Sequence, residues 1–119
     1  IISCATMSEK PLVQGRWLKH GCHLDLVGGF KPSMREVDDE AVQRARIFVD
    51  TRTGAGMEAG DLVDPTKRGV IGPDAIIGDL FELTRNTPGR HTKDEITLFK
   101  SVGTAIEDLA AAEMVVERS

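Results

Sequence analysis

The sequence predicts an α/β fold, in which part of a doubly wound, mostly parallel sheet carries flanking helices and a long C-terminal helix. Short apolar runs of strand length alternate with helix-like stretches along the chain. These runs are apolar nearly throughout, which is typical of parallel strands covered on both faces. Long connections separate most of the runs, and parallel strands need such crossovers.

Composition narrows the class of protein. The chain has 119 residues, of which 40% are hydrophobic and 29% charged, so it can bury the core of one domain or of part of a larger one. The net charge of −4 and the lack of a basic stripe argue against a nucleic-acid partner. No apolar stretch approaches the ~20 residues that cross a bilayer, so we expect no membrane partner.

The cysteines indicate the cellular compartment, and the first residues indicate whether the chain is part of a longer polypeptide. Cys4 and Cys22 cannot build a disulfide framework and suit a reducing compartment, so we expect a cytoplasmic protein. The chain opens with Ile1 and Ile2 inside a strand-like run, without an initiator Met. We therefore interpret it as a piece of a longer polypeptide.

Two strands are predicted before the first helix. Residues 1–5 form an apolar run that is too short for a helix and is followed by a polar turn. Residues 22–27 form the second run, which Gly28 and Gly29 end. Asp25 is the one acidic residue inside this run, and a charge at such a position needs a partner or a ligand.

A helix and a third strand follow. The pattern Ser33-x-x-Glu36 leads into a helix over residues 38–45, whose acidic first turn suits the helix dipole. Arg35 and Glu36, with the acidic residues that follow, are interpreted as a solvated helix start rather than a binding site. Residues 46–50, with the sequence RIFVD, are predicted to form the third strand.

The middle of the chain is less regular. Residues 51–59 can form a helix, which Gly60 is expected to end. Prolines and glycines between residues 65 and 73 predict a string of short turns. Residues 79–85 are predicted to be helical, with Asp79 as the N-cap and a glutamate three residues further on.

The C-terminal part contains the last strand and the longest helix. Residues 96–99 form a short apolar run of strand length. Residues 102–116 place apolar side chains at spacings of three and four, which makes one apolar stripe on a helix. Ser101 is expected to cap this helix, and Gly103 to keep its first turn slim.

The ends of the predicted strands form the expected binding site, because ligands of open parallel sheets bind beyond the carboxyl ends of the strands. The residues concerned are 5–6, 27–30 and 101–103. Gly28 and Gly29 let the backbone approach a flat ligand such as a nicotinamide ring, although a plain tight turn also explains them. Free backbone N–H groups after Ser101 can bind a carboxylate or a phosphate, although a simple helix start also explains them.

Other candidate constellations are weaker. Cys4, His20, Cys22 and His23 do not have the spacing of zinc ligands, so we predict no metal site. Both cysteines lie in apolar runs, which favours buried small side chains over a catalytic thiol. The sequence has no G-x-G-x-x-G phosphate loop.

Several short motifs occur in order along nearly the whole chain. They are ISCAT at 2–6, PLV at 11–13, HLDLVG at 23–28, RE at 35–36, FVD at 48–50, AGDL at 59–62, GDL at 78–80, EITLFKSVG at 95–103 and EDL at 107–109. In this order they resemble the ornithine cyclodeaminase/mu-crystallin family. The resemblance implies a parent roughly two or three times as long, with a dinucleotide-binding Rossmann domain and a second domain for substrate binding and dimerisation.

In that scheme residues 1–100 form the second half of the Rossmann domain, and residues 101–119 form a helix that leads back toward the other domain. The resemblance implies NAD(P) as cofactor, a small imino-acid or amino-acid substrate, and a homodimer. It assigns neither a catalytic residue nor a metal ligand to this chain. The implied cofactor-binding residues are Cys4, Ala5, Thr6, Leu24, Asp25, Leu26, Val27 and Ser101, and the implied substrate-binding residues are Phe30, Val102 and Gly103.

One position departs from the family pattern. Cyclodeaminases and alanine dehydrogenases of the family typically carry an aspartate where this chain has Phe30, and a phenyl ring cannot act as an acid or base. The sequence Phe-Lys-Ser at 99–101 also resembles the ketimine-reductase branch.

These departures favour one activity of the parent over two alternatives. We expect an NAD(P)H-dependent reductase of cyclic imino acids such as Δ1-pyrroline-2-carboxylate or Δ1-piperideine-2-carboxylate. One alternative is an ornithine cyclodeaminase, which converts ornithine to proline and ammonia with bound NAD. The other is a non-catalytic, mu-crystallin-like binding protein.

Overall fold

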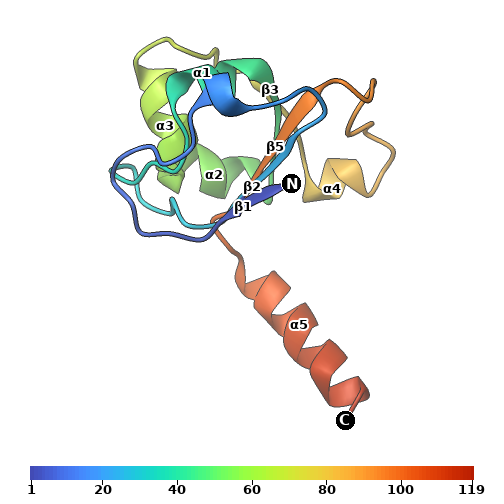
Figure 1. Ribbon diagram of the computed structural model, residues 1–119. Coiled ribbons are helices and arrows are strands. Elements are labelled where there is room, and N and C mark those ends of the chain that lie inside the picture. Colours follow the sequence, from blue (N-terminus) through green and yellow to red (C-terminus); the bar gives the residue numbers. More distant parts are fainter.

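The computed structural model describes residues 1–119 and contains one five-stranded sheet, in which every strand is parallel to its neighbours (Figure 1). The strand order is β1-β2-β5-β3-β4. The strands are β1 (Ile2–Cys4), β2 (His23–Leu26), β3 (Ala45–Val49), β4 (Ile76–Asp79) and β5 (Ile96–Lys100). The structure confirms the predicted α/β class and the parallel sheet, and β4 is a strand that the sequence did not predict.

Helices connect the strands and begin mostly where the sequence predicts. They are the 3-10 helix η1 (Gly15–Trp17), α1 (Asp39–Arg44), α2 (Arg52–Glu58), α3 (Gly60–Lys67), α4 (Leu80–Leu83) and α5 (Ala105–Glu117). Asp38 caps α1 and Thr51 caps α2, each through a side-chain oxygen that accepts a backbone N–H. Asp79 and Glu82 form a capping box at the start of α4, which is shorter than the predicted helix.

Helix α3 corrects the prediction that Gly60 ends a helix and that turns follow. Gly60 instead begins a new helix directly after Ala59, which ends α2. A Cβ at Gly60 would overlap the backbone oxygen of Met34, so a close contact explains this glycine. Pro65 lies buried inside α3, where packing outweighs its unfavourable effect on a helix.

The two faces of the sheet are covered unequally. Helices α1, α2 and α3 lie on one face (Figure 1). The core on this face includes Leu24, Leu26, Ile47, Val49 and Leu98. On the opposite face His23 and Asp25 remain half-exposed, and α4 covers only part of the sheet near Phe48. The expectation that both faces are covered is therefore met only in part within this chain, where Phe48 and Thr97 are buried but His23 and Asp25 are not.

Helix α5 projects away from the sheet (Figure 1). None of its residues is buried, so most of the predicted apolar stripe is exposed; of its members, Val102 packs against the core and Ile106 borders a cavity with Leu80 and Phe81. The predicted cap at Ser101 is wrong: Thr104 is the N-cap, and its N–H donates to Oε2 of Glu107 over 2.8 Å. No helix has the length and apolarity that crossing a bilayer would require.

Candidate functional site

A cavity of about 360 Å³ lies where three neighbouring strands end. Strands β1, β2 and β5 are adjacent and parallel, so the residues that follow them meet at one edge of the sheet. The lining residues are Ala5, Thr6, Met7, Val27, Gly28, Phe30, Ser101, Val102 and Gly103. The structure thus brings together the three segments that the sequence predicted, and it adds Met7. Their role in binding a ligand stays a prediction.

Part of the predicted cofactor-binding set does not line this cavity. The side chains of Cys4, Leu24 and Leu26 are buried in the core, on the helix-covered face of the sheet. The carboxylate of Asp25 accepts a hydrogen bond from the hydroxyl of Ser3, with 2.8 Å between Oδ2 and Oγ. Ser3 is therefore the hydrogen-bond partner of the charged Asp25. None of Cys4, Leu24, Asp25 and Leu26 lines the cavity.

A buried carboxylate holds the turn after β5. Asp50, which directly follows β3, accepts hydrogen bonds at Oδ2 from the N–H groups of Val102 and Gly103, both over 2.8 Å. The hydroxyl of Ser101 lies 3.4 Å from the same oxygen. The N–H groups that the sequence left available to an anion therefore already contact a carboxylate of this chain. Gly103 has a φ of 85°, and the helix begins only beyond this turn.

A second buried carboxylate, that of Glu36, holds the ends of β1 and β2. It accepts hydrogen bonds from Thr6 and from the N–H of Gly28. The interpretation of Arg35 and Glu36 as a solvated helix start is therefore wrong, because their exposed fractions are only 8% and 0%. Glu36 does not cap the helix, because Asp38 does so two residues later.

Close packing explains the glycine pair after β2. A Cβ at Gly28 would overlap the backbone of Thr6 and the carboxylate of Glu36, and a Cβ at Gly29 would overlap Oδ2 of Asp61. Neither glycine has a left-handed φ. The sequence left two explanations for the glycine pair, the approach of a ligand and a plain tight turn. The structure gives a third, because a side chain at either position would overlap other atoms of the chain.

Lys100, the last residue of β5, is a fully buried cation next to the cavity-lining Ser101. Its Nζ donates hydrogen bonds to the backbone oxygens of Leu26, over 3.1 Å, and of Ser101, over 3.0 Å. It therefore joins the ends of β2 and β5. Burial lowers the pKa of Lys100, while the carboxylates of Asp61 and Glu36 act in the opposite direction. The sequence signal for this role is a lysine at the end of an apolar strand.

The cavity lining can orient a ligand but cannot exchange protons with it. The lining side chains are apolar or carry a hydroxyl, and none is an acid or base near neutral pH. Phe30 contributes an aromatic ring that is 39% exposed. No cluster of three or more His, Cys, Asp or Glu side chains is placed to hold a metal ion. The arrangement therefore suits a flat or partly apolar organic ligand.

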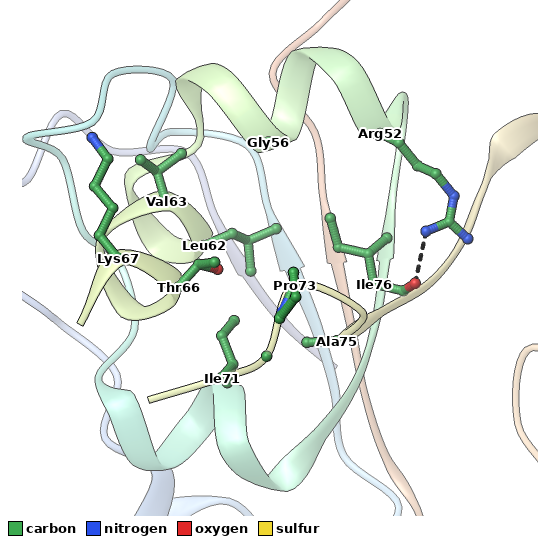
Figure 2. A pocket seen from close by; sticks show the side chains of 11 residues that line it. Arg52, Gly56, Leu62, Val63, Thr66, Lys67, Ile71, Pro73, Ala75 and Ile76 are labelled. Atoms are coloured by element: carbon green, nitrogen blue, oxygen red, sulfur yellow. Dashed lines mark hydrogen bonds between the residues drawn. The ribbon is translucent and has the colours of Figure 1, made fainter. Parts of the chain in front are cut away.

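A different cavity, of about 340 Å³, lies between α2, α3 and the segment that leads into β4 (Figure 2). Its wall includes Ile76, which is the first residue of β4. This cavity therefore lies at the amino end of a strand and not at a carboxyl end. Arg52 lies at this cavity, but its Nη1 donates to the backbone oxygen of Ile76 over 2.8 Å. This cavity contains none of the predicted site residues, so we take the cavity at the strand ends as the candidate site.

Comparison with known proteins gives consistent matches along the chain. A model of the ornithine cyclodeaminase/mu-crystallin family matches residues 1–119. Protein SAR DEFICIENT 4 of Arabidopsis thaliana is 51% identical over 118 residues, which cover 98% of this chain and 36% of the plant protein. Delta(1)-pyrroline-2-carboxylate reductase of Colwellia psychrerythraea is 46% identical over 120 residues, which cover 99% of this chain and 38% of that enzyme.

A solved structure is similar over the same region. It is that of Thermococcus litoralis Delta(1)-pyrroline-2-carboxylate reductase in complex with NADH and L-proline. The two superpose with a TM-score of 0.90 at 40% identity, over 97% of this chain and 36% of that one. This chain therefore spans little more than a third of the length of the relatives it matches.

Proposed function

Because the chain belongs to the ornithine cyclodeaminase/mu-crystallin family, we propose that it forms one side of the nicotinamide pocket of an NAD(P)H-dependent reductase. The substrate is a cyclic imino acid of the Δ1-pyrroline-2-carboxylate or Δ1-piperideine-2-carboxylate type. The observation that carries this proposal is the cavity at the ends of β1, β2 and β5, which gathers segments far apart in the sequence. The names of a close relative and of a similar solved structure support the substrate class.

The cavity fits the nicotinamide end of the cofactor. It has room for a ring-sized group, and its wall combines apolar side chains with hydroxyl groups and strand-end backbone. Ala5, Thr6, Val27 and Ser101 are the residues of this wall that would hold the cofactor. Cys4, Leu24, Asp25 and Leu26 support it from within the sheet rather than by direct side-chain contact.

Reduction of the substrate C=N bond needs a hydride at carbon, which bound NAD(P)H would supply, and a proton at nitrogen, which a substrate bound in its protonated iminium form would already carry. Phe30, Val102 and Gly103 form the part of the wall that the substrate ring contacts. The ring of Phe30 excludes water from this position and cannot take or give a proton, which suits reduction better than deamination. Asp50 keeps the turn that carries Val102 and Gly103 in a fixed position.

The domain scheme follows from the same proposal. Residues 1–100 form the second half of the dinucleotide-binding domain, and residues 101–119 connect it to a substrate and dimerisation domain. The exposed apolar side chains of α5, among them Ile106 and Leu109, are consistent with such a connection. Two free cysteines suit a reducing compartment, and we place the protein in the cytoplasm as a homodimer.

The test uses the full-length protein that carries this segment. Δ1-pyrroline-2-carboxylate is mixed with NADH or NADPH, and the loss of reduced cofactor is followed by absorbance. We expect turnover with at least one of the two cofactors. Release of ammonia from ornithine, without reduction of the imine, would show that the protein is a cyclodeaminase instead.

A further inference from the structure

The backbone N–H groups of Thr6 and Gly28, at the candidate site, both donate hydrogen bonds to the buried carboxylate of Glu36. Oε1 of Glu36 accepts hydrogen bonds from the N–H of Thr6, over 2.7 Å, and from its hydroxyl, over 2.8 Å. Oε2 accepts a hydrogen bond from the N–H of Gly28 over 3.0 Å. Thr6 and Gly28 both line the cavity, whereas Glu36 does not. One carboxylate therefore fixes two neighbouring strand ends from behind the wall they form.

We propose that Glu36 is a positioning residue that preassembles the nicotinamide side of the pocket before the cofactor binds. The proposal rests on the proposed function of this cavity. The regular pairing of β1 with β2 ends at Cys4 and Leu26, with one further contact from Val27 N to Cys4 O over 2.8 Å. Beyond this point the N–H groups of Thr6, which is partly buried, and Gly28, which is buried, bind the Glu36 carboxylate instead of a neighbouring strand. Loss of these hydrogen bonds would cost stability and order.

The position of Glu36 is itself fixed by the layer of helices. Its backbone N–H donates to Oδ1 of Asp61 over 2.7 Å, and the N–H of Val37 donates to the same oxygen over 3.0 Å. Asp61 lies in the first turn of α3, and its exposed fraction is 0%. The segment around Glu36 is thus attached to α3 at one side and to the strand ends at the other.

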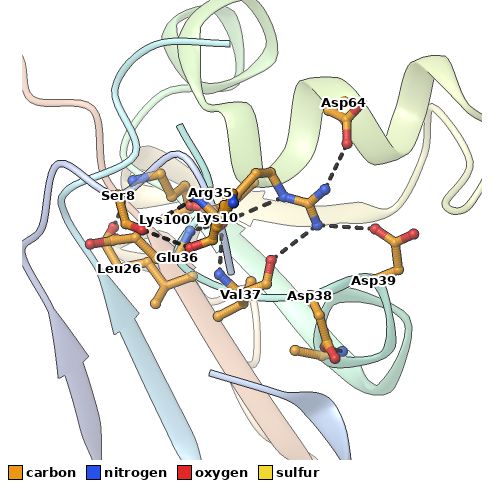
Figure 3. Close-up of polar contacts among 12 residues, drawn as sticks. Ser8, Lys10, Leu26, Arg35, Glu36, Val37, Asp38, Asp39, Asp64 and Lys100 are labelled. Atoms are coloured by element: carbon orange, nitrogen blue, oxygen red, sulfur yellow. Dashed lines mark hydrogen bonds and ion pairs between the residues drawn. The ribbon is translucent and has the colours of Figure 1, made fainter. Parts of the chain in front are cut away.

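Arg35 attaches the same segment more firmly (Figure 3). Its guanidinium donates to Asp64 of α3 over 2.6 Å and to Asp39 of α1 over 3.0 Å. It also donates to the backbone oxygen of Val37 over 3.0 Å. Charge-assisted hydrogen bonds of this kind are short and directional, so they can hold Glu36 in one place.

The chemistry of the contacts requires a carboxylate. Three donors approach the two oxygens of Glu36, and an ionised carboxylate offers acceptors only. A glutamine has one acceptor oxygen, so its NH2 group would face either Gly28 or Thr6. Glu36→Gln therefore keeps the size of the side chain but loses its contact with one of the two strand ends.

The experiment compares full-length wild type with Glu36→Gln and with Glu40→Gln, which removes an exposed carboxylate on α1. NADH binding is titrated by fluorescence, and the fraction folded is followed by thermal unfolding. We expect Glu36→Gln to raise the Kd for NADH about tenfold in the folded enzyme. Glu40→Gln should leave the Kd unchanged. A purely structural role would lower the Tm of Glu36→Gln without changing that Kd.

Hydrogen exchange on the cofactor-free wild type gives a second readout that does not depend on a variant folding. The proposal expects the amides of Thr6 and Gly28 to be protected before NADH is added. Rapid exchange of both amides, or an unchanged Kd for folded Glu36→Gln, would overturn the role of Glu36 alone. Failure of the wild type to bind either reduced cofactor would instead overturn the proposed function together with this inference.

Discussion

Phe30 is the side chain whose chemistry the proposed reaction uses most directly. Phe30 is 39% exposed and lines the cavity. We predict that Phe30→Asp in the full-length protein lowers kcat for Δ1-pyrroline-2-carboxylate at least about tenfold, because a carboxylate brings water into an apolar wall. Steady-state kinetics at saturating cofactor measures this change.

Phe81→Asp is the matched control for that variant. Phe81 lies on α4, is 56% exposed and does not line the candidate cavity. We expect its replacement to leave kcat unchanged. Equal kcat for wild type and Phe30→Asp would remove Phe30 from the site.

Gly28 shows how closely the strand ends are packed. A Cβ at this position would overlap backbone atoms of Thr6 and the buried carboxylate of Glu36, and neither group can move aside easily. We predict that Gly28→Ala lowers the free energy of unfolding by about 3 kcal/mol or more. Urea denaturation of the full-length protein measures the change.

Gly56→Ala tests whether this effect is specific to packing. Gly56 lies inside α2, and a Cβ there would meet no atom within 4 Å. Alanine is the better helix former, so this variant should gain about 0.5–1 kcal/mol. Similar effects of the two substitutions would contradict the packing argument at Gly28.

Helices α1 and α3 are joined by a network of ion pairs that responds to acid. Nη2 of Arg68 lies 2.6 Å from Asp39 on α1 and 2.9 Å from Asp64 on α3. The hydrogen bonds from Arg68, with further ones from Arg35, lower the pKa of Asp39 from 3.8 to about 2. A depressed carboxyl pKa stabilises the fold above the unfolded value of 3.8, and this contribution is lost as the pH falls toward 2.

We predict that Arg68→Gln is less stable than wild type near neutral pH and that the difference shrinks as the pH falls from about 4 to 2. The effect is modest because the pairs are partly exposed and salt screens them. Urea denaturation at a series of pH values measures it. Arg16→Gln, which removes an exposed arginine that forms no ion pair, serves as control and should show no such pH dependence. A constant difference across the range would contradict the assignment to Asp39.

The starts of α1, α2 and α4 could be predicted from the sequence because their signals are local, whereas α5 begins after Thr104 and not after Ser101. Asp38, Thr51 and Asp79 each lie at the N-cap, and each accepts an N–H three residues later. Gly60 and Pro65 could not be interpreted in this way. Whether these residues lie in a helix depends on the contact of α3 with a loop about 25 residues earlier. The sequence alone therefore predicted a break where the structure has a helix.

The residues that hold the site were missed for a related reason. Glu36 contacts a residue 30 positions away, and Asp50 contacts Val102, 52 positions away. Glu36 stands next to charged residues, which locally is typical of a solvated segment, and Asp50 stands at the end of a predicted strand, where nothing in the local sequence marks a contact with Val102. The cavity-lining residues were found because they directly follow apolar runs, whereas burial of an isolated carboxylate leaves no periodic pattern.

The arrangement of the whole sheet explains why the meeting of these strand ends was predictable although the strand order was not. In a parallel sheet all carboxyl ends lie at one edge, whatever the order of the strands. The order decides which ends are adjacent, and here the ends of β1, β2 and β5 meet at the cavity, while β4 is an outermost strand.

Strand β1 is the other outermost strand of the sheet. The backbone groups on its outer side are unpaired, and they favour association with a further strand.

The same architecture limits what this chain binds by itself. The cavity of about 360 Å³ accommodates a ring rather than a whole dinucleotide, and it lies beyond the ends of β1, β2 and β5, where β1 is an edge strand with one unpaired side. We predict that the isolated chain binds NADPH with a Kd above about 100 µM, because a cavity of this size contacts only a ring-sized part of a dinucleotide. A titration followed by NADPH fluorescence measures the affinity, with circular dichroism to establish that the chain is folded. Micromolar affinity of the folded chain would mean that these strand ends bind much more of the cofactor than its nicotinamide end.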